Sequence, residues 1–338
     1  MPRVVAVVVN WNQPQLTIRC VDGLRDQAGP DELEIVIVDN GSTDDSLAEL
    51  QAAGWSDCIV AMKRNVGFGA GVNAAVAASP ADLYLLVNND AVPQADFIRL
   101  LLAAEAQASA ATGAFTAQIH LSGTFERAPS TGGSTPVFEA RNGVRWSRSE
   151  SGTRLINSTG GVIDASGNGS DRNWLDPIGT KAPAEVFAFS GGGALLRRAA
   201  LDDVGGFDES LFMYYEDTEL SWRLRRRGWL VQYVEGAVLI HDHAASSGTT
   251  SDLFLFRNAQ NRIIVALWHS PGRVVALAIL RTVARIAMDL ASTSHRARGR
   301  LLTRALGGIV AALPRHLRHR RAESALSIIP ASRIHTGP

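Results

Sequence analysis

Four short apolar runs, each followed by a polar segment and then a helical pattern, make up the first third of the chain. The runs are rich in β-branched residues and cover residues 4–9, 34–39, 58–63 and 83–88. Runs of this kind are typical of strands buried on both faces of a parallel sheet. Helices are expected over residues 14–27, 46–53 and 72–78, and a further one from Pro93. Because β-α units are joined by right-handed crossovers, the pattern predicts an α/β fold with a doubly wound, mostly parallel sheet.

The pattern weakens between residues 122 and 179, where Gly, Ser, Thr, Asn and Pro accumulate. A long irregular section in a compact protein is commonly a functional loop. Residues 157–164 and 167–174, which end at Trp174, are expected either to form the inner part of an acceptor site or to be a solvated insertion. Regular patterns return as a strand, a triple-glycine turn and a second strand over 185–197, and as two strands over 230–234 and 237–240.

The last part of the chain is helical in pattern and strongly basic. Formal net charge is zero, so no overall field favours nucleic acid. Between Arg273 and Arg321, however, there are eleven arginines and one acid, Asp289. Two interpretations stay open: an amphipathic helix packed on the domain, or one that lies on an anionic membrane surface. We expect disorder beyond Ser324.

The two cysteines and the start of the chain bear on location. Cys20 and Cys58 have no metal-like spacing and fall in apolar segments, as expected of reduced core thiols in a cytosolic protein. The chain begins with a strand-like run and shows neither a signal peptide nor a spanning helix. A cytoplasmic protein is therefore expected, with association at the inner face of the cell membrane as the added hypothesis.

Polar side chains follow each of the four predicted strands. They are Asn10 and Asn12, then Asp39 and Asn40, then Arg64 and Asn65, and finally Asn88, Asn89 and Asp90. Ligands of doubly wound sheets bind beyond the carboxyl ends of the strands, so these residues predict a binding site. Asp90 is either an oxygen ligand for Mg²⁺ or Mn²⁺ on a diphosphate or a cap of the next helix. His241 ends a later strand and could add an imidazole ligand.

A glycine-rich turn over residues 65–73 follows the third strand. Its G-x-G-x-G spacing and its place in the third β-α unit argue against a dinucleotide fingerprint. Backbone N–H groups near Gly67 and Gly69 could still approach a phosphate, because a helix N-terminus favours anions.

Glu216 and Asp217 form an acidic pair between an aromatic run and a helical pattern. Acidic residues in a first helical turn complement the helix dipole, which is the structural interpretation. A functional role for the pair is the alternative.

With these motifs the chain resembles the family 2 inverting glycosyltransferases of the GT-A fold, within them the bacterial rhamnosyltransferase-like branch, over residues 3–265. The motifs are Val-Asp-Asn-Gly-Ser-Thr-Asp at 38–44, Asn-Val-Gly-Phe-Gly-Ala-Gly-Val-Asn at 65–73, Val-Asn-Asn-Asp at 87–90, Ser-Gly-Gly-Gly at 190–193, Gly-Gly-Phe-Asp-Glu at 205–209 and Tyr-Glu-Asp-Thr-Glu-Leu-Ser-Trp-Arg at 215–223. Their order and spacing together are specific.

The resemblance implies roles for individual residues. Asp39 and Arg64 would help to hold the base and ribose, Asp90 and His241 the metal, and Asp217 would be the catalytic base with Glu216 beside it. The nucleotide-sugar site would comprise Asn10, Asp39, Arg64, Asn65, Gly67, Gly69, Asn88 and Asn89. The acceptor site would comprise Trp174, Gly191, Gly192, Tyr215 and Glu216. Asn88 departs from the pattern, since many members have Asp there.

The resemblance also implies an organisation and a reaction. A glycosyltransferase domain is expected over 1–250, with a Rossmann-like nucleotide-binding half (1–120) and an acceptor-binding half (121–250), followed by an Arg-rich helical region (251–323) and a tail (324–338). The expected reaction moves a sugar, with rhamnose from dTDP-rhamnose preferred, onto a cell-envelope glycan or glycolipid. The alternatives are a UDP-hexose or UDP-galactofuranose donor, or a catalytically silent nucleotide-sugar-binding scaffold. A homo-oligomer is considered, and no nucleic-acid partner is expected.

Overall fold

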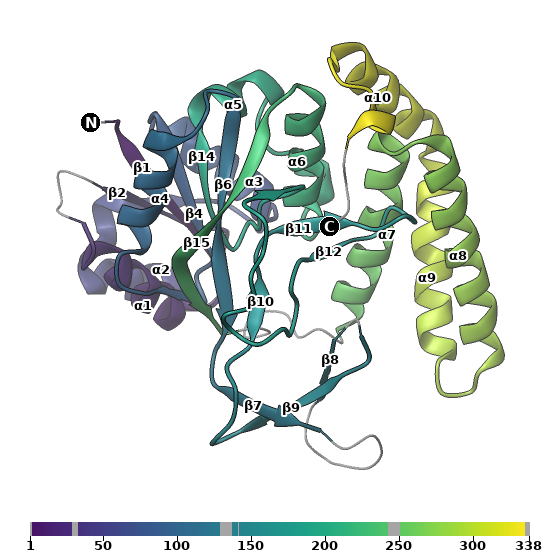
Figure 1. Cartoon of the computed structure of the whole chain (residues 1–338), viewed down its shortest axis with the longest axis horizontal. Helices are drawn as coiled ribbons and strands as arrows, with labels where there is room; N and C mark the ends of the chain where they lie inside the picture. The colour runs from purple at the N-terminus through teal and green to yellow at the C-terminus, as the bar shows by residue number, and fades with distance from the viewer. Residues whose placement is uncertain (1, 29–32, 129–136, 141, 243–250, 335–338) are drawn as a thin grey trace.

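The computed structural model describes residues 2–28, 33–128, 137–140, 142–242 and 251–334. Its centre is a curled sheet between helices (Figure 1). Strands β1 (Val4–Asn10), β2 (Glu34–Asp39), β3 (Ile59–Ala61) and β4 (Leu83–Val87) pair in parallel in the order β3-β2-β1-β4. The predicted parallel half of the sheet is confirmed, with all four polar strand ends at one edge.

The second half of the sheet is mixed. Strand β14 (Gly193–Arg197) runs antiparallel between β4 and β6 (Thr112–Leu121), and β15 (Leu230–His241) runs parallel to β6. Short strands β5 (Ala91–Pro93), β10 (Ile156–Ser158) and β13 (Glu185–Val186) complete the edges. The two strands expected over 230–234 and 237–240 are one strand, because a register shift around Gly236, at φ 93°, keeps both parts paired with β6.

Helices cover both faces of the sheet. Helices α1 (Pro14–Arg25) and α4 (Phe97–Gln107) pack on one face, together with the short helix α2 (Ser46–Leu50). Helices α3 (Phe68–Ala78), α5 (Arg198–Val204) and α6 (Glu216–Arg226) pack on the other. A doubly wound sheet needs apolar residues on both faces, and each face here has its own buried cluster.

Several predicted helix bounds were wrong. The helix expected from Pro93 begins at Phe97, because residues 91–93 pair with β15 as β5. The helix expected from residue 72 begins at Phe68, immediately after the turn at Gly67. The helix expected over 46–53 changes to a π-helical turn, Gln51–Trp55, because Gly54 at φ 89° interrupts the regular dihedral angles. Of the two cysteines, Cys20 is buried in the core and Cys58 is half-buried, and both are free thiols.

The section over 122–179 contains more regular structure than predicted. Strands β7 (Thr124–Arg127), β8 (Val137–Glu139) and β9 (Arg145–Ser149) form a small antiparallel sheet, and β11 (Gly161–Ile163) pairs with β12 (Gly169–Asp171). Phe125, Trp146 and Leu155 give the insertion its own buried cluster, against which Trp174 packs. The strands are too short to show in a hydrophobic pattern.

Four helices follow the sheet domain: α7 (Asp252–His269), α8 (Gly272–Ala291), α9 (Arg296–Ala311) and α10 (Leu313–Leu326). Helix α7 packs next to α6, and α8 and α9 lie on the far side of α7 (Figure 1). Contrary to the expected disorder from 324, the chain stays in contact through residue 334: the N–H groups of Ile328 and Ile329 donate to the carbonyl of Arg226 at 2.8 and 2.9 Å. Residues 335–338 lie outside the described residues. Within the ranges that the structure describes, no helix combines the length and apolar composition needed to cross a bilayer.

Candidate active site

The ends of β1 and β2 form a buried polar cluster. Asn10 donates from Nδ2 to Asp39 Oδ1 at 3.0 Å, and Thr17 donates from Oγ1 to Asn10 Oδ1 at 2.8 Å. Ser42 donates to Asp39 from its hydroxyl at 2.6 Å and from its backbone N–H at 3.3 Å. Asp39 is therefore held rigidly at the sheet edge, while Arg64 lies exposed at the rim. Asp39 and Arg64 are two of the residues predicted to contact the nucleotide.

The glycine-rich turn is tied to this edge by amide side chains. Asn40 donates from Nδ2 to Asn65 Oδ1 and to the carbonyl of Gly67, both at 3.1 Å. Gly67 has φ 93°, and a Cβ there would lie 2.0 Å from the carbonyl oxygen of Phe212. A Cβ on Gly69 would lie 2.9 Å from Phe207 Cβ. These glycines thus let the turn meet the loops of the second half of the chain.

Asp90 and His241 meet where β4 and β15 end. His241 Nε2 lies 2.9 Å from Asp90 Oδ1, and His241 Nδ1 lies 2.8 Å from Asn157 Oδ1. Asp90 and Asn157 are buried. Asn89 donates from Nδ2 to Thr17 Oγ1 at 3.2 Å, on the Asn10 side of the cluster. The structure therefore brings Asp90, His241 and the strand ends into one region.

The Asp90 and His241 pair fits a divalent cation. An amide oxygen only accepts, so the contact with Asn157 places a proton on Nδ1 of His241 and turns Nε2 towards Asp90. A protonated Nε2 donates to the carboxylate of Asp90 at this distance, and a deprotonated Nε2 can bind a cation together with that carboxylate. Adjacent ligands of an octahedral ion with bonds of about 2.1 Å stand about 3 Å apart, which matches. No three His, Cys, Asp or Glu side chains of the described residues cluster around a metal position, so other ligands would come from diphosphate and water.

Glu216 and Asp217 open helix α6. Asp217 Oδ1 accepts from the backbone N–H of Thr218 at 2.6 Å, and Oδ2 accepts from that of Gly191 at 3.1 Å. Burial raises the pKa of Asp217, and these backbone hydrogen bonds act against that rise by favouring the ionised form. Asp217 thus combines a basic carboxylate with a fixed orientation, as a proton acceptor requires.

Glu216 meets a different environment. Burial, and then the charge of Asp217, raise the pKa of Glu216 to about 8. Its Oε2 atom is buried and has no hydrogen-bond partner among the described residues. At neutral pH Glu216 is therefore mostly protonated while Asp217 is the better candidate for the ionised member of the pair.

The turn Ser190–Gly192 connects the two chemical centres. The backbone N–H of Asn88 donates to the carbonyl of Gly192 at 3.2 Å, and that of Gly191 donates to Asp217. A Cβ on Gly192 would lie 3.3 Å from Asn88 Nδ2, and one on Gly191 would lie 3.3 Å from Phe68. Two glycines therefore allow the strand end that carries Asp90 to lie beside the start of α6.

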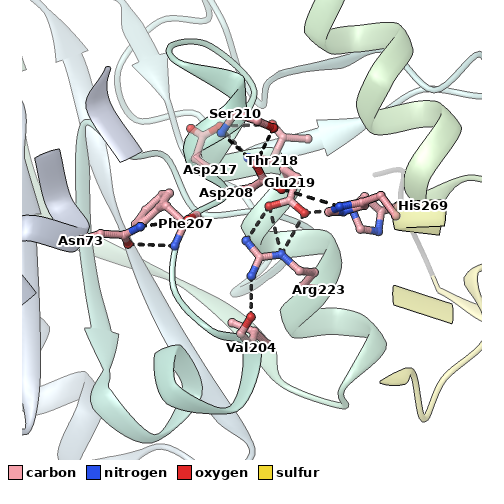
Figure 2. A network of polar contacts seen from close by, with 11 residues as sticks. Asn73, Val204, Phe207, Asp208, Ser210, Asp217, Thr218, Glu219, Arg223 and His269 are labelled. Atoms are coloured by element: carbon pink, nitrogen blue, oxygen red, sulfur yellow. Dashed lines mark hydrogen bonds and ion pairs between the residues drawn. The ribbon is translucent and has the colours of Figure 1, made fainter. Parts of the chain in front are cut away.

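A buried ionic network lies beneath Asp217 (Figure 2). Glu219 accepts from Arg223 Nε at 2.8 Å and lies 3.0 Å from His269 Nε2, and Glu219 and His269 are fully buried. Burial by itself raises the pKa of Glu219, but Arg223 and His269 outweigh it and lower the pKa to about 2. Arg223 also donates to the carbonyl of Val204 at 2.6 Å. The network fixes α6 to α5 and α7.

Some predicted acceptor residues have structural partners. Tyr215 is buried, and its hydroxyl lies 3.2 Å from Asn168 Oδ1 and from the carbonyl of Gly169, so it anchors β12 beside α6. Trp174 lies in the small core of the insertion. Sequence analysis missed Asn157 as a partner of His241, and Glu219 and His269 altogether. The only available signal was the i, i+4 spacing of Glu219 and Arg223.

Two family models match successive parts of the chain. The family model "Glycosyl transferase family 2" matches residues 5–170, and "Glycosyl transferase family group 2" matches residues 166–263. An N-acetylglucosaminyl-diphospho-decaprenol L-rhamnosyltransferase of Mycobacterium tuberculosis is 29% identical over 221 residues, which are 64% of this chain and 68% of the relative. Together the two models reach from the first strand to α7.

Solved structures have a similar fold. The mannosyltransferase PcManGT from Pyrobaculum calidifontis, in complex with GDP-Man and Mn²⁺, has a TM-score of 0.51 and 16% identity, covering 97% of this chain and 81% of its own. TarS 1–349 from S. aureus, in complex with UDP-GlcNAc, has a TM-score of 0.53 and 14% identity, covering 95% and 88%. At such identities the likeness shows the fold alone, and it confirms the predicted architecture.

Proposed function

The chain belongs to glycosyltransferase family 2 and has the GT-A fold, and from this premise we propose that it is an inverting, metal-dependent transferase of L-rhamnose. The donor in this proposal is dTDP-rhamnose, and the acceptor is a hydroxyl of a cell-envelope glycan or glycolipid. The rhamnosyltransferase from M. tuberculosis, whose name gives N-acetylglucosaminyl-diphospho-decaprenol as its acceptor, supports this choice. Whichever sugar is transferred, the general activity is glycosyl transfer.

On the acceptor side, Asp217 is the proposed catalytic base. Inversion requires the acceptor hydroxyl to attack the anomeric carbon from the face opposite the leaving diphosphate, and its proton must go to a base on that side. The hydrogen bonds from Gly191 and Thr218 keep the Asp217 carboxylate in one orientation. Protonated Glu216 beside it can donate a hydrogen bond to the acceptor.

On the donor side, Asp90 and His241 are the proposed holders of Mg²⁺ or Mn²⁺, with Asn157 fixing the ring of His241. The ion, when bound, offsets the negative charge on the leaving diphosphate. Asp39 and Arg64, with Asn10, Asn65 and the turn at Gly67 and Gly69, are the proposed binding surface for the nucleotide. PcManGT was solved with Mn²⁺ and GDP-Man, which supports a metal in this fold.

One observation carries the proposal. The turn at Ser190–Gly192 contacts Asn88, two residues before Asp90, through Gly192 and contacts Asp217 through Gly191. The residues proposed for the leaving-group site and for the base therefore lie on either side of one short turn, which supports an in-line displacement.

A transfer assay with wild-type protein tests the proposal. Purified protein is incubated with Mn²⁺, a GlcNAc-diphospho-polyprenol analogue and, in turn, dTDP-rhamnose, UDP-glucose, UDP-GlcNAc and UDP-galactofuranose. We expect transfer from dTDP-rhamnose, and its loss with EDTA. Faster transfer from a UDP-sugar would favour that alternative. Nucleotide-sugar binding without any transfer would favour a silent scaffold.

The composition of the outer face of α8 supports a glycolipid acceptor. This face is exposed and apolar, and consists of Ala276, Ile279, Leu280, Val283, Ala287, Met288 and Leu290. Arg273, Arg281 and Arg285 flank it and are exposed. The nearby acid Asp289 is buried and pairs with Arg298 at 2.6 Å and with Arg285 at 3.3 Å, so it offsets part of the charge of Arg285, whereas Arg273 and Arg281 make no ion pair with it. We propose that this face lies on an anionic membrane, where the lipid acceptor is found.

A further inference from the structure

The loop that leads into α6 has a strained backbone. Phe212, Tyr214 and Tyr215 have φ angles of 62°, 66° and 71°. Side chains with a Cβ rarely adopt positive φ, so three such residues within four positions store strain. The N–H of Met213 also donates to the carbonyl of Leu211 at 2.8 Å, which closes a γ-turn of the rare positive-φ kind around Phe212. Such a loop persists only where its surroundings hold it.

Asn261 of helix α7 holds the loop through hydrogen bonds. Its side chain is buried, with 1% of its surface exposed. Its Nδ2 atom lies 2.8 Å from the carbonyl oxygen of Leu211, 2.9 Å from that of Met213 and 2.8 Å from that of Tyr214. An amide has two hydrogens, so one of them is shared between two carbonyls. A single side chain thus satisfies three carbonyls of the strained loop.

The loop contacts both halves of the site. At its first end, the carbonyl of Phe212 accepts from the N–H of Phe68 at 2.9 Å, next to Gly67 in the glycine-rich turn. At its second end, Tyr215 is the residue before α6 and Asp217 follows two positions later. A shift of the loop would therefore change the distance from Asp217 to the donor side.

We infer that Asn261 is a positioning residue, which holds the loop over residues 211–215 in its positive-φ form and thereby aims the Asp217 carboxylate. The inference rests on the proposed role of Asp217. It makes α7 part of the catalytic unit, although α7 lies outside the sheet domain. Asp at position 261 would place carboxylate oxygens against three carbonyl oxygens, so an amide donor is required there.

The test is a double-mutant cycle between Asn261, which holds the loop, and Phe212, where the loop backbone is strained. Asn261→Ala should lower kcat at least tenfold while the donor KM changes less than threefold, because Asn40 and Asn65 still hold the donor turn. Phe212→Gly should restore at least a third of the lost kcat in the Asn261→Ala background, because glycine adopts positive φ without support. A residue with a merely structural role would give no such rescue.

Asn258→Ala is the matched control. Asn258 is half-buried, lies one turn earlier on α7, and makes no described hydrogen bond to the loop. Its kcat should stay within twofold of wild type. If Asn261→Ala keeps wild-type kcat, or if Phe212→Gly multiplies the loss instead of reducing it, the inference is wrong.

Hydrogen exchange separates this inference from the proposed function. In Asn261→Ala the amides of Phe68 and Met213, which bond to carbonyls at the start of the loop, should exchange at least tenfold faster than in wild type. This readout needs no substrate. If wild type transfers no sugar but these amides exchange faster in Asn261→Ala, the proposed function fails and the role of Asn261 in holding the loop stands. Unchanged exchange in Asn261→Ala would refute that role of Asn261.

Discussion

At the scale of single residues, Glu216 and Asp217 are neighbours in sequence with different surroundings. Backbone hydrogen bonds favour the ionised form of Asp217, whereas Glu216 Oε2 has no partner among the described residues. The environment, not the residue type, therefore divides their roles.

Glu216→Gln should change the alkaline side of the pH profile. In wild type, kcat should fall as pH rises through about 8, because Glu216 then ionises beside Asp217. Glutamine mimics the protonated acid, so the variant should keep neutral-pH activity within about threefold and lose the alkaline fall.

The same variant tests the pH dependence of stability. The raised pKa of Glu216 makes the folded state bind more protons than the unfolded state between about pH 4.5 and 8, so wild-type stability should fall with rising pH in that window. Identical profiles for both proteins would contradict this.

Asn157→Leu should weaken the metal site without removing a ligand. Asn157 fixes the ring of His241, and loss of such a partner typically costs about ten- to a hundredfold in metal affinity. The Mn²⁺ concentration for half-maximal activity should rise accordingly, measured by titration after EDTA treatment. Asn168→Leu, on the acceptor side, is the control and should leave the Mn²⁺ requirement unchanged. An unchanged requirement in Asn157→Leu would refute the assignment of His241.

At the scale of elements, α6 is held from below by the network of Glu219, Arg223 and His269. Glu219→Gln leaves the buried Arg223 without its charge partner and should lower the free energy of unfolding by about 3–5 kcal/mol, measured by urea denaturation. Glu235→Gln, which removes an exposed ion pair with Lys181, should cost no more than about 1 kcal/mol. The lowered pKa of Glu219 means that its contribution is present above about pH 4.5 and is lost as pH falls towards about 2. Equal losses for both variants would show that the network is not stabilising.

Helix α8 should bind anionic vesicles through its outer face. Leu280, with 65% of its surface exposed, and Val283, with 47%, are replaced by Glu. The double variant should lose co-sedimentation with vesicles of 30% phosphatidylserine, and wild-type binding should weaken with salt. Leu253→Glu, on α7, is the control for added charge. If wild type sediments equally without vesicles, self-association explains the apolar face instead.

At the scale of the whole molecule, local patterns predicted the parallel half of the sheet and the residues at its edge. Asn10, Asp39 and Asp90 follow apolar strands, and the topology rule for such sheets then brings them together. The antiparallel position of β14 and the single strand β15 depend on long-range pairing that no local pattern encodes.

The supporting contacts were beyond the sequence for the same reason. Asn157 lies 84 positions from His241, and Asn261 lies 47 positions from Tyr214. An asparagine in a helical or glycine-rich stretch has no distinctive pattern, and only the fold shows which carbonyl or imidazole it meets.

The most direct test of the central claim follows the stereochemistry of transfer in wild type and in Asp217→Asn. Nuclear magnetic resonance of the product from dTDP-rhamnose should show an anomeric configuration opposite to that of the donor. Asp217→Asn should lower kcat by about 10²–10⁴-fold, the size of a general-base contribution, while binding of dTDP-rhamnose stays within threefold of wild type. Retention of configuration, or wild-type kcat in Asp217→Asn, would contradict an inverting transferase with Asp217 as its base.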